Sequence, residues 1–119
     1  MLVKIIVIFF MAGCQVKQVD TLEVLPGATS IERGKRLTFS YGCAVCHEIS
    51  GINDYPGNIG PSLVNWGKQK YIAGAVPNRM PELILWLKNP QAIQKNSAMP
   101  NLNMTEEEAS DIATYLYSQ

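Results

Sequence analysis

The first clear pattern of apolar and polar residues lies between Ser30 and Gly42, and it is that of an amphipathic helix. Serine often caps a helix at its N-terminus, and glycine often follows the last turn. Between these two residues, apolar and small side chains recur at intervals of three and four, which places them on one helix face. They are Ile31, Gly34, Leu37 and Thr38. The pattern therefore predicts one helix that leads directly into the segment after Gly42.

The remainder of the chain predicts a long loop and two more helices. Residues 48–77 are rich in Gly, Asn and Pro, and no alternation in them is long enough to predict a strand. Pro81 suits a first helical position, and the short, buried, apolar helix after it must stop before Pro90. Thr105 and the acidic residues up to Glu108 form a capping box for a last helix. The inward stripe of that helix is expected to comprise Ala109, Ile112, Ala113 and Leu116 or Tyr115.

The N-terminus has the pattern of an export signal. Met1–Lys4 carries one positive charge, and Ile5–Phe10 is uniformly apolar but too short to span a bilayer. The residues before Cys14 resemble a bacterial lipobox, with Met11 in place of the usual leucine. A plain secretory signal with cleavage elsewhere is the alternative. We expect residues 1–13 to be a lipoprotein signal peptide and Cys14 to become a lipid anchor.

The next segment is expected to be a tether. Residues 15–29 are mostly polar, are broken by Pro26-Gly27 and have no helical or strand periodicity. Fully extended, these roughly 15 residues could reach about 50 Å at about 3.3 Å each. The sequence thus predicts a lipidated cysteine with a flexible tether over 14–29 and a folded domain over 30–119.

Length and charge restrict the classes of function. The 119 residues provide room for one domain, and ten basic residues balance ten acidic ones, so no nucleic-acid-binding surface is expected. Three short helices around a long loop cannot bury much apolar surface by themselves. We therefore expect something other than side chains to fill part of the core.

Cys43, Cys46 and His47 form the sequence Cys-Ala-Val-Cys-His, the attachment sequence for c-type haem. Two cysteines three residues apart can each add to one vinyl group on the same porphyrin edge, and the adjacent histidine then points at the iron. A zinc site would need four ligands, yet besides Cys14 the chain offers only these two cysteines and one histidine. A thiol oxidoreductase would be expected near a βαβ pattern, and a structural disulfide beside a histidine is the third alternative. The motif favours one covalent haem c.

Further residues are candidates for the second axial position and for orienting the histidine. The other ring nitrogen of His47 would normally donate to a backbone carbonyl, for which Gly60–Leu63 is the expected source. The chain offers Met80, Met99 and Met104 as a sixth iron ligand. Packing explains the first and the last, since each directly precedes a helix. Met99 lies in a polar loop before a proline, so it is the expected ligand, and its thioether would favour ferrous iron.

With these motifs in order, residues 34–117 resemble a class I cytochrome c. The resemblance rests on Gly34–Leu37, Cys43–His47, Gly60–Leu63, Met99-Pro100 and Ile112–Leu116. It implies an all-α fold of about three to four short helices wrapped around one covalently bound haem c. Residues 72–74, 76–78, 83–86 and 90–100 carry a nearer resemblance to the cytochrome c domain fused to subunit II of some bacterial haem-copper oxidases.

The sequence departs from that subunit II pattern in places. It has no fused copper domain, and Thr38 stands where an aromatic side chain is frequent. Gln69 and Lys70 stand where arginines often meet the haem propionates. This leaves Trp66 and Lys70 as candidates for propionate contacts, and Pro61 as a further residue against the haem.

These observations predict a membrane-anchored, one-electron carrier outside the cytoplasm. We expect an electron-transfer protein and not an enzyme. With His47 and Met99 on the iron, no open position would remain for a small-molecule substrate. The partners implied by the resemblance are a quinol-oxidising complex as donor and a terminal oxidase as acceptor. A fixed haem c subunit of an oxidase or reductase is one alternative, and a haem sensor or peroxidase with a displaceable methionine is another.

Overall fold

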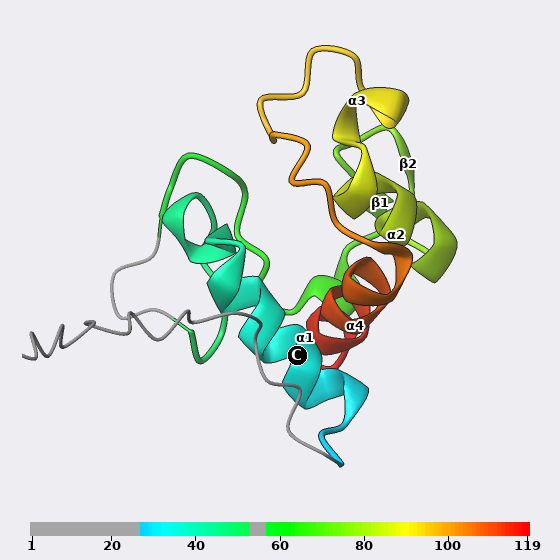
Figure 1. Cartoon of the computed structure of the whole chain (residues 1–119). Coiled ribbons are helices and arrows are strands. Elements are labelled where there is room, and N and C mark those ends of the chain that lie inside the picture. Colours follow the sequence, from blue (N-terminus) through cyan, green and yellow to red (C-terminus); the bar gives the residue numbers. More distant parts are fainter. Residues whose placement is uncertain (1–26, 53–56) are drawn as a thin grey trace, which may run out of the picture.

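The computed structural model describes residues 27–52 and 57–119, so the predicted signal peptide, Cys14 and most of the predicted tether lie outside the described residues. Four α-helices dominate this described part of the chain, as the all-α prediction requires (Figure 1). The helices are α1 (Ser30–Ser40), α2 (Met80–Lys88), α3 (Pro90–Ile93) and α4 (Glu106–Tyr117). Two 3₁₀ turns, η1 (Cys43–Val45) and η2 (Trp66–Lys68), and two paired two-residue strands, β1 (Tyr71–Ile72) and β2 (Val76–Pro77), complete the elements. No helix in residues 27–52 or 57–119 is long and apolar enough to cross a membrane.

The helices α1 and α4 lie side by side and form the base of the fold (Figure 1). Their closest approach is at Gly34, where the methyl group of an alanine would lie only 2.0 Å from the carbonyl oxygen of Asp111. Thr38, one turn further along α1, is buried and its hydroxyl donates to the Gly34 carbonyl at 2.8 Å. The small residues of the predicted stripe therefore let two helix backbones meet directly.

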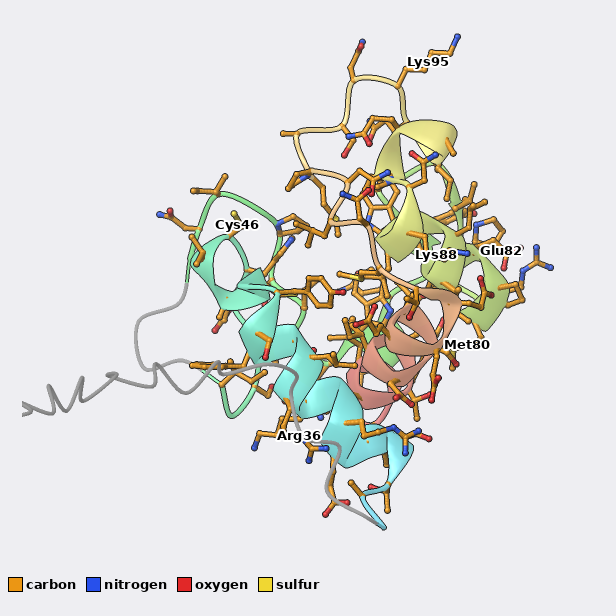
Figure 2. The ribbon with its side chains drawn as sticks, in the orientation of Figure 1. Arg36, Cys46, Met80, Glu82, Lys88 and Lys95 are labelled. Atoms are coloured by element: carbon orange, nitrogen blue, oxygen red, sulfur yellow. The ribbon has the colours of Figure 1, made fainter. Side chains whose placement is uncertain are left out.

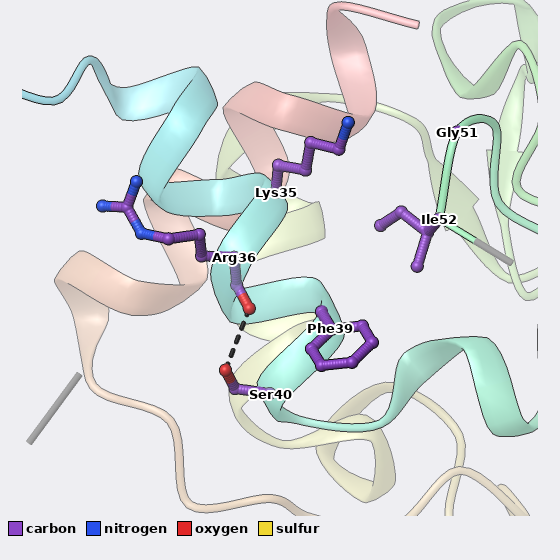
Figure 3. Close-up of a pocket in the computed structure, with 6 residues that line it drawn as sticks. All are labelled: Lys35, Arg36, Phe39, Ser40, Gly51 and Ile52. Atoms are coloured by element: carbon purple, nitrogen blue, oxygen red, sulfur yellow. Dashed lines mark hydrogen bonds between the residues drawn. The ribbon is translucent and has the colours of Figure 1, made fainter.

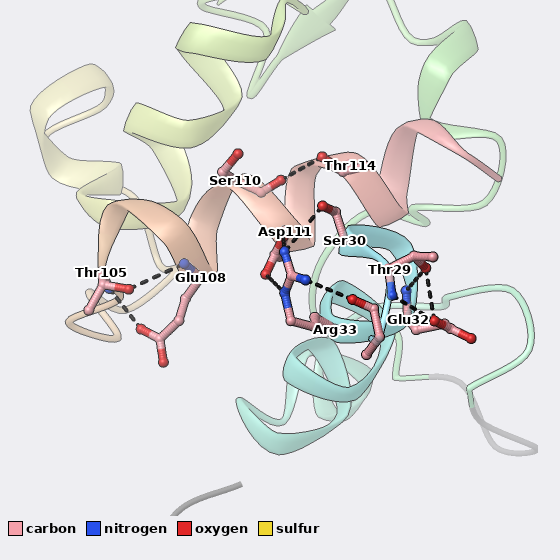
Figure 4. A network of polar contacts seen from close by, with 10 residues as sticks. Thr29, Ser30, Glu32, Arg33, Thr105, Glu108, Ser110, Asp111 and Thr114 are labelled. Carbon is pink, nitrogen blue, oxygen red and sulfur yellow. Dashed lines mark hydrogen bonds and ion pairs between the residues drawn. The ribbon is translucent and has the colours of Figure 1, made fainter. Parts of the chain in front are cut away.

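Capping boxes begin both of these helices (Figure 4). The box at Thr105 and Glu108 is confirmed, and the predicted inward stripe of α4 is buried. The predicted cap at Ser30 is wrong, because Thr29 holds that position and accepts from the Glu32 backbone N–H at 3.3 Å. The physical reason is that Glu32 lies three residues after Thr29, so its carboxylate can accept in return from the Thr29 backbone N–H at 2.7 Å.

An ion pair between Arg33 and Asp111 ties α1 to α4 (Figure 4). Arg33 Nε and one terminal nitrogen donate to the two Asp111 oxygens at 2.6 and 2.9 Å. Because Asp111 is buried, Arg33 pairs with a carboxylate inside the contact between α1 and α4 and is not merely a solvated surface charge.

The second helix and its neighbours form the upper half of the fold. α2 begins at Met80, one residue before the predicted start, and it buries Leu83 and Leu87 while Leu85 stays exposed. Pro90 ends α2 as predicted but also begins the short α3, which the sequence pattern did not predict. Residues 57–77 are mostly loop, as expected, apart from η2 and the short β1–β2 ladder.

Candidate functional site

The Cys-x-x-Cys-His segment follows α1 through one tight turn. Gly42 adopts φ +70°, a conformation that glycine tolerates best, and the chain then enters η1. The backbone N–H groups of Cys46 and His47 both donate to the carbonyl of Cys43, at 3.2 and 3.0 Å. This winding places both half-buried, free cysteine thiols and the imidazole at the end of α1.

His47 is held from its Nδ1 side. This nitrogen lies 2.7 Å from the carbonyl oxygen of Pro61, inside the stretch from which the carbonyl was expected. A methyl group on Gly60 would lie 2.4 Å from the imidazole, so only glycine leaves room for the ring here. With Nδ1 donating to a carbonyl, the lone pair of Nε2 is available to a metal.

Gly57 is a residue of the site that sequence reasoning missed. A methyl group there would lie 2.2 Å from the carbonyl oxygen of Val45, so this glycine lets the returning chain pack against η1. The only available signal was a glycine three residues before Gly60, within a loop already rich in glycine.

A cleft of about 660 Å³ lies beside this segment. It is lined by each of the predicted site residues of the domain, namely Cys43, Cys46, His47, Pro61, Trp66 and Met99. Its walls include core residues of α2 and α4, among them Leu83, Ile112 and Leu116. The loop after α3, which carries Met99, lies across the opening from the turn after α1 (Figure 1). The cleft is therefore an apolar space that side chains leave unfilled, and a flat, largely apolar group fits there.

The three candidate methionines occupy different surroundings. Met99 is half-buried and lines the cleft, whereas Met104 is buried in the core. Met80 is 37% exposed on α2 and does not line the cleft (Figure 2). Of these three, only Met99 therefore shares a cleft with His47.

Gln91 of α3 secures the backbone around Met99. Its side-chain Nε2 donates to the carbonyl of Met99 at 2.8 Å and to that of Ser97 at 3.3 Å. The Met99 backbone N–H donates to the Ser97 hydroxyl at 3.2 Å. The loop that carries the thioether is thus held by hydrogen bonds, and Gln91 is a second residue that sequence reasoning did not single out for this role.

Two features of the cleft test whether it suits a haem. Trp66 is 7% exposed, and its Nε1 is a buried donor without a hydrogen-bond partner, so the wall holds a donor for an anionic group such as a propionate. Burial raises the pKa of the Cys43 thiol to about 11, which disfavours a thiolate. Among residues 27–52 and 57–119, no three His, Cys, Asp or Glu side chains gather as a metal-binding group. The donor set fits a covalent haem and does not fit a zinc site.

A second hollow lies on the outer side of α1, next to the loop at Gly51 and Ile52 (Figure 3). It measures about 420 Å³ and is also lined by Lys35, Arg36, Phe39 and Ser40. None of these residues lines the larger cleft. The hollow has no thiol, thioether or imidazole on its walls, so it is separate from the haem-attachment site.

A helical fold with the haem-attachment sequence at the mouth of an apolar cleft defines a c-type haem domain. Comparison with known families matches residues 31–119 to the family described as cytochrome c. The chain belongs to the cytochrome c family, whose domains bind haem c covalently and transfer electrons.

Two curated relatives are both named cytochrome c oxidase subunit 2. The one from Alkalihalophilus pseudofirmus (strain ATCC BAA-2126 / JCM 17055 / OF4) is 29% identical over 94 residues, which cover 78% of this chain and 27% of the relative. The one from Bacillus sp. (strain PS3) is 26% identical over 84 residues, which cover 67% of this chain and 24% of the relative. The chain thus spans about a quarter of the length of these relatives.

Proposed function

We propose that this chain is a membrane-anchored, one-electron carrier with a single haem c, attached through Cys43 and Cys46 and ligated by His47 and Met99. The observation that carries the proposal is the single cleft lined by both thiols, the imidazole and the thioether. When bound, the haem supplies iron that cycles between its ferric and ferrous forms.

The residues of the chain would orient this group and set its electronic properties. The Pro61 carbonyl accepts from His47 Nδ1, which fixes the ring orientation and makes Nε2 a stronger ligand. The Met99 thioether would raise the reduction potential as an iron ligand, and Gln91 holds the backbone from which that thioether extends. Because His47 and Met99 would both hold the iron, the proposed role is electron transfer without a small-molecule substrate.

Trp66 is the proposed donor to a haem propionate. Trp66 lines the cleft and its Nε1 is buried and unpartnered, so a negatively charged acceptor would satisfy it with a charge-assisted hydrogen bond. Lys70, the other candidate from the sequence, is exposed and is absent from the cleft lining. We therefore assign the propionate contact to Trp66.

The proposed setting is the outer face of a bacterial membrane, with Cys14 as the lipid anchor. The lipobox-like residues before Cys14 support the anchor, and the names of the two relatives support a terminal oxidase as the electron acceptor. A quinol-oxidising complex is the proposed donor. Tethering would raise the effective concentration of the carrier at its membrane partners.

The attachment chemistry tests the proposal most directly. The mature protein should retain its haem in acidified organic solvent, and intact mass should exceed that of the polypeptide by one haem. Cys43→Ala and Cys46→Ala should each leave one thioether, and the double variant should release the haem. Freely extractable haem in the wild-type protein, or a mass corresponding to two haems, would contradict the proposal.

A second candidate is a fixed haem c subunit of an oxidase, which the similarity to two oxidase subunits favours. Solubilisation in mild detergent followed by sizing separates the two roles. Elution as a free small cytochrome supports a mobile carrier, whereas co-elution with oxidase activity supports a subunit.

A further inference from the structure

The side chain of Asn78 connects three separate parts of the fold. Its Nδ2 donates to the backbone carbonyl of Trp66 at 3.1 Å and to that of Gln69 at 3.0 Å. Its Oδ1 accepts from the Tyr117 hydroxyl at 2.7 Å. Its backbone N–H donates to the Lys70 carbonyl at 2.9 Å. Asn78 therefore fastens both ends of η2 to the last turn of α4.

Tyr117 supports η2 in a second way. Its ring passes close to Gly67, where a methyl group would lie 3.8 Å from the ring carbon Cδ1. Burial raises the pKa of the Tyr117 hydroxyl, and the nearby charge of Glu82 adds to this effect. The hydroxyl is consequently a neutral donor at physiological pH, and its bond to Asn78 does not depend on titration.

The segment held by these bonds has little stability of its own. η2 is a 3₁₀ turn of three residues, and it begins after Asn65, which adopts φ +54°. A single 3₁₀ turn has poor hydrogen-bond geometry, and the left-handed conformation is less favourable for asparagine than for glycine. The position of η2 must therefore come from outside contacts, and the Asn78 bonds supply such a contact at each of its two ends.

The residue at the start of η2 is Trp66, which lines the cleft and whose indole Nε1 is buried without a hydrogen-bond partner. Within the described residues, the only other buried side-chain polar atom without a partner is Glu82 Oε2. The hydrogen bond from Asn78 is made to the backbone carbonyl of Trp66. Asn78 can therefore control the position of the indole although Asn78 itself does not contact the cofactor.

We propose that Asn78 and Tyr117 are positioning residues that fix Trp66 so that its indole N–H donates to an anionic group bound in the cleft. Under the proposed function, on which this inference rests, that group is a haem propionate. A well-placed donor offsets negative charge near the iron, which disfavours the ferric form and raises the potential. Loss of the hydrogen bonds made by Asn78 and Tyr117 should therefore lower the reduction potential and also expose the indole N–H of Trp66.

The test follows the Trp66 indole N–H in the haem-loaded, reduced protein by nitrogen-15 NMR, with the Trp86 indole as an internal reference. Tyr117→Phe removes one hydroxyl, and hydrogen exchange at Trp66 should accelerate roughly fivefold to tenfold, as one lost hydrogen bond of ordinary strength allows. The reduction potential should fall in the same variant, while exchange at Trp86 stays unchanged.

Tyr115→Phe is the matched control. It removes the same atom from α4 two residues earlier, but that hydroxyl donates to the carbonyl of Ser50 at 3.0 Å, away from η2. This control should leave both the exchange at Trp66 and the potential unchanged. Equal acceleration in both tyrosine variants would show general loosening and would overturn the proposal.

Asn78→Asp provides an independent variant, because it keeps the acceptor for Tyr117 but loses the donor to Trp66 and Gln69. It should accelerate Trp66 exchange at least as much as Tyr117→Phe does. Unchanged Trp66 exchange in a haem-loaded Asn78→Asp protein would overturn the proposal even if Tyr117→Phe fails to fold. Absence of haem from the wild-type protein, visible beforehand in its absorption spectrum, would instead refute the proposed function.

Discussion

The side-chain nitrogen of Gln91 lies 2.8 Å from the backbone carbonyl oxygen of Met99. This bond links a short helix that begins at Pro90 to the loop that forms part of the cleft. The proposed thioether ligand thus extends from a backbone that a neighbouring element restrains. Restraint of this kind reduces the entropy that would be lost when the sulfur binds iron.

Replacement of Gln91 by alanine should weaken methionine ligation without abolishing it. Loss of the bond costs about 1 kcal/mol, so the sulfur should leave the ferric iron roughly five to ten times more often. The measurement is competition by imidazole for the ferric iron, which should succeed at lower concentration in Gln91→Ala. Gln119→Ala removes the same kind of side chain from a position that does not line the cleft, where its Nε2 donates to the Tyr115 carbonyl at 3.3 Å, and should leave the competition unchanged. Equal behaviour of the two variants would contradict the role of Gln91.

Gly34→Ala should strongly destabilise the fold, because the added methyl group would lie 2.0 Å from the Asp111 carbonyl oxygen and 2.8 Å from Tyr115 Cβ. The helices would have to separate, at a cost of about 3 kcal/mol or more in unfolding free energy. Gly74→Ala is the control, because nothing lies within 4 Å of that position. Strain from its positive φ should cost only about 1 kcal/mol. Denaturant titration of both haem-loaded variants measures the difference.

Local patterns predicted the parts of this fold that depend on neighbours in sequence. The capping box at Thr105 and the stripe of α4 both follow from residues within a few positions of one another. The same reasoning placed the first cap one residue late, because Ser30 and Thr29 are both good caps and only the bond from Thr29 to Glu32 distinguishes them.

Contacts between distant segments were beyond local reasoning. The bonds from Asn78 to Trp66 and from Gln91 to Met99 join loop positions that carry no periodicity. The pairing of Arg33 with Asp111 joins residues 78 positions apart and depends on the crossing of α1 and α4. The sequence motifs nevertheless identified residues that line one cleft. The spacing within a haem-attachment motif is set by the group that it binds, so it can be recognised without knowing how distant segments pack.

Acid should weaken the start of α4. The Thr105 backbone N–H donates to Glu108 at 2.8 Å and lowers the pKa of that carboxyl below its ordinary value of 4.5. Because the folded pKa is the lower one, this stabilisation is present above about 4.5 and is lost as pH falls through the folded pKa.

Glu108→Gln should therefore lose about 0.3 to 1 kcal/mol of unfolding free energy at neutral pH. The difference from wild type should shrink as the pH is lowered below the ordinary carboxyl pKa. Glu107→Gln, which removes a neighbouring charge outside the capping box, should not reproduce this pH dependence. Denaturant titrations at several pH values provide the measurement, and a constant difference at all pH values would contradict the assignment.

Cys14→Ser should leave the haem spectrum intact and change where the protein is found. The predicted anchor lies before the cytochrome c domain, so its loss should not disturb the cleft. Cell fractionation should show the variant in the soluble extracytoplasmic fraction and the wild-type protein with membranes. Unchanged membrane retention of the variant would point to the leader or to a partner protein as the true attachment.

Met99→Ala provides the most direct test of the axial ligand. Met99 is the candidate methionine that lines the cleft with His47, so its loss should abolish the near-infrared band from thioether to ferric iron. The potential should fall because a ligand that favours ferrous iron is gone, and the open position should bind carbon monoxide.

The other two methionines serve as controls of different kinds. Met80 is 37% exposed on α2, so Met80→Ala should change little. Met104 is 5% exposed in the core, and Met104→Ala should cost about 2 to 5 kcal/mol of unfolding free energy while the band persists. Spectra and denaturant titrations of the three variants separate ligation from packing. A Met99→Ala protein that kept the band, with its loss in Met80→Ala instead, would require a distal side built from α2 and not from the loop after α3.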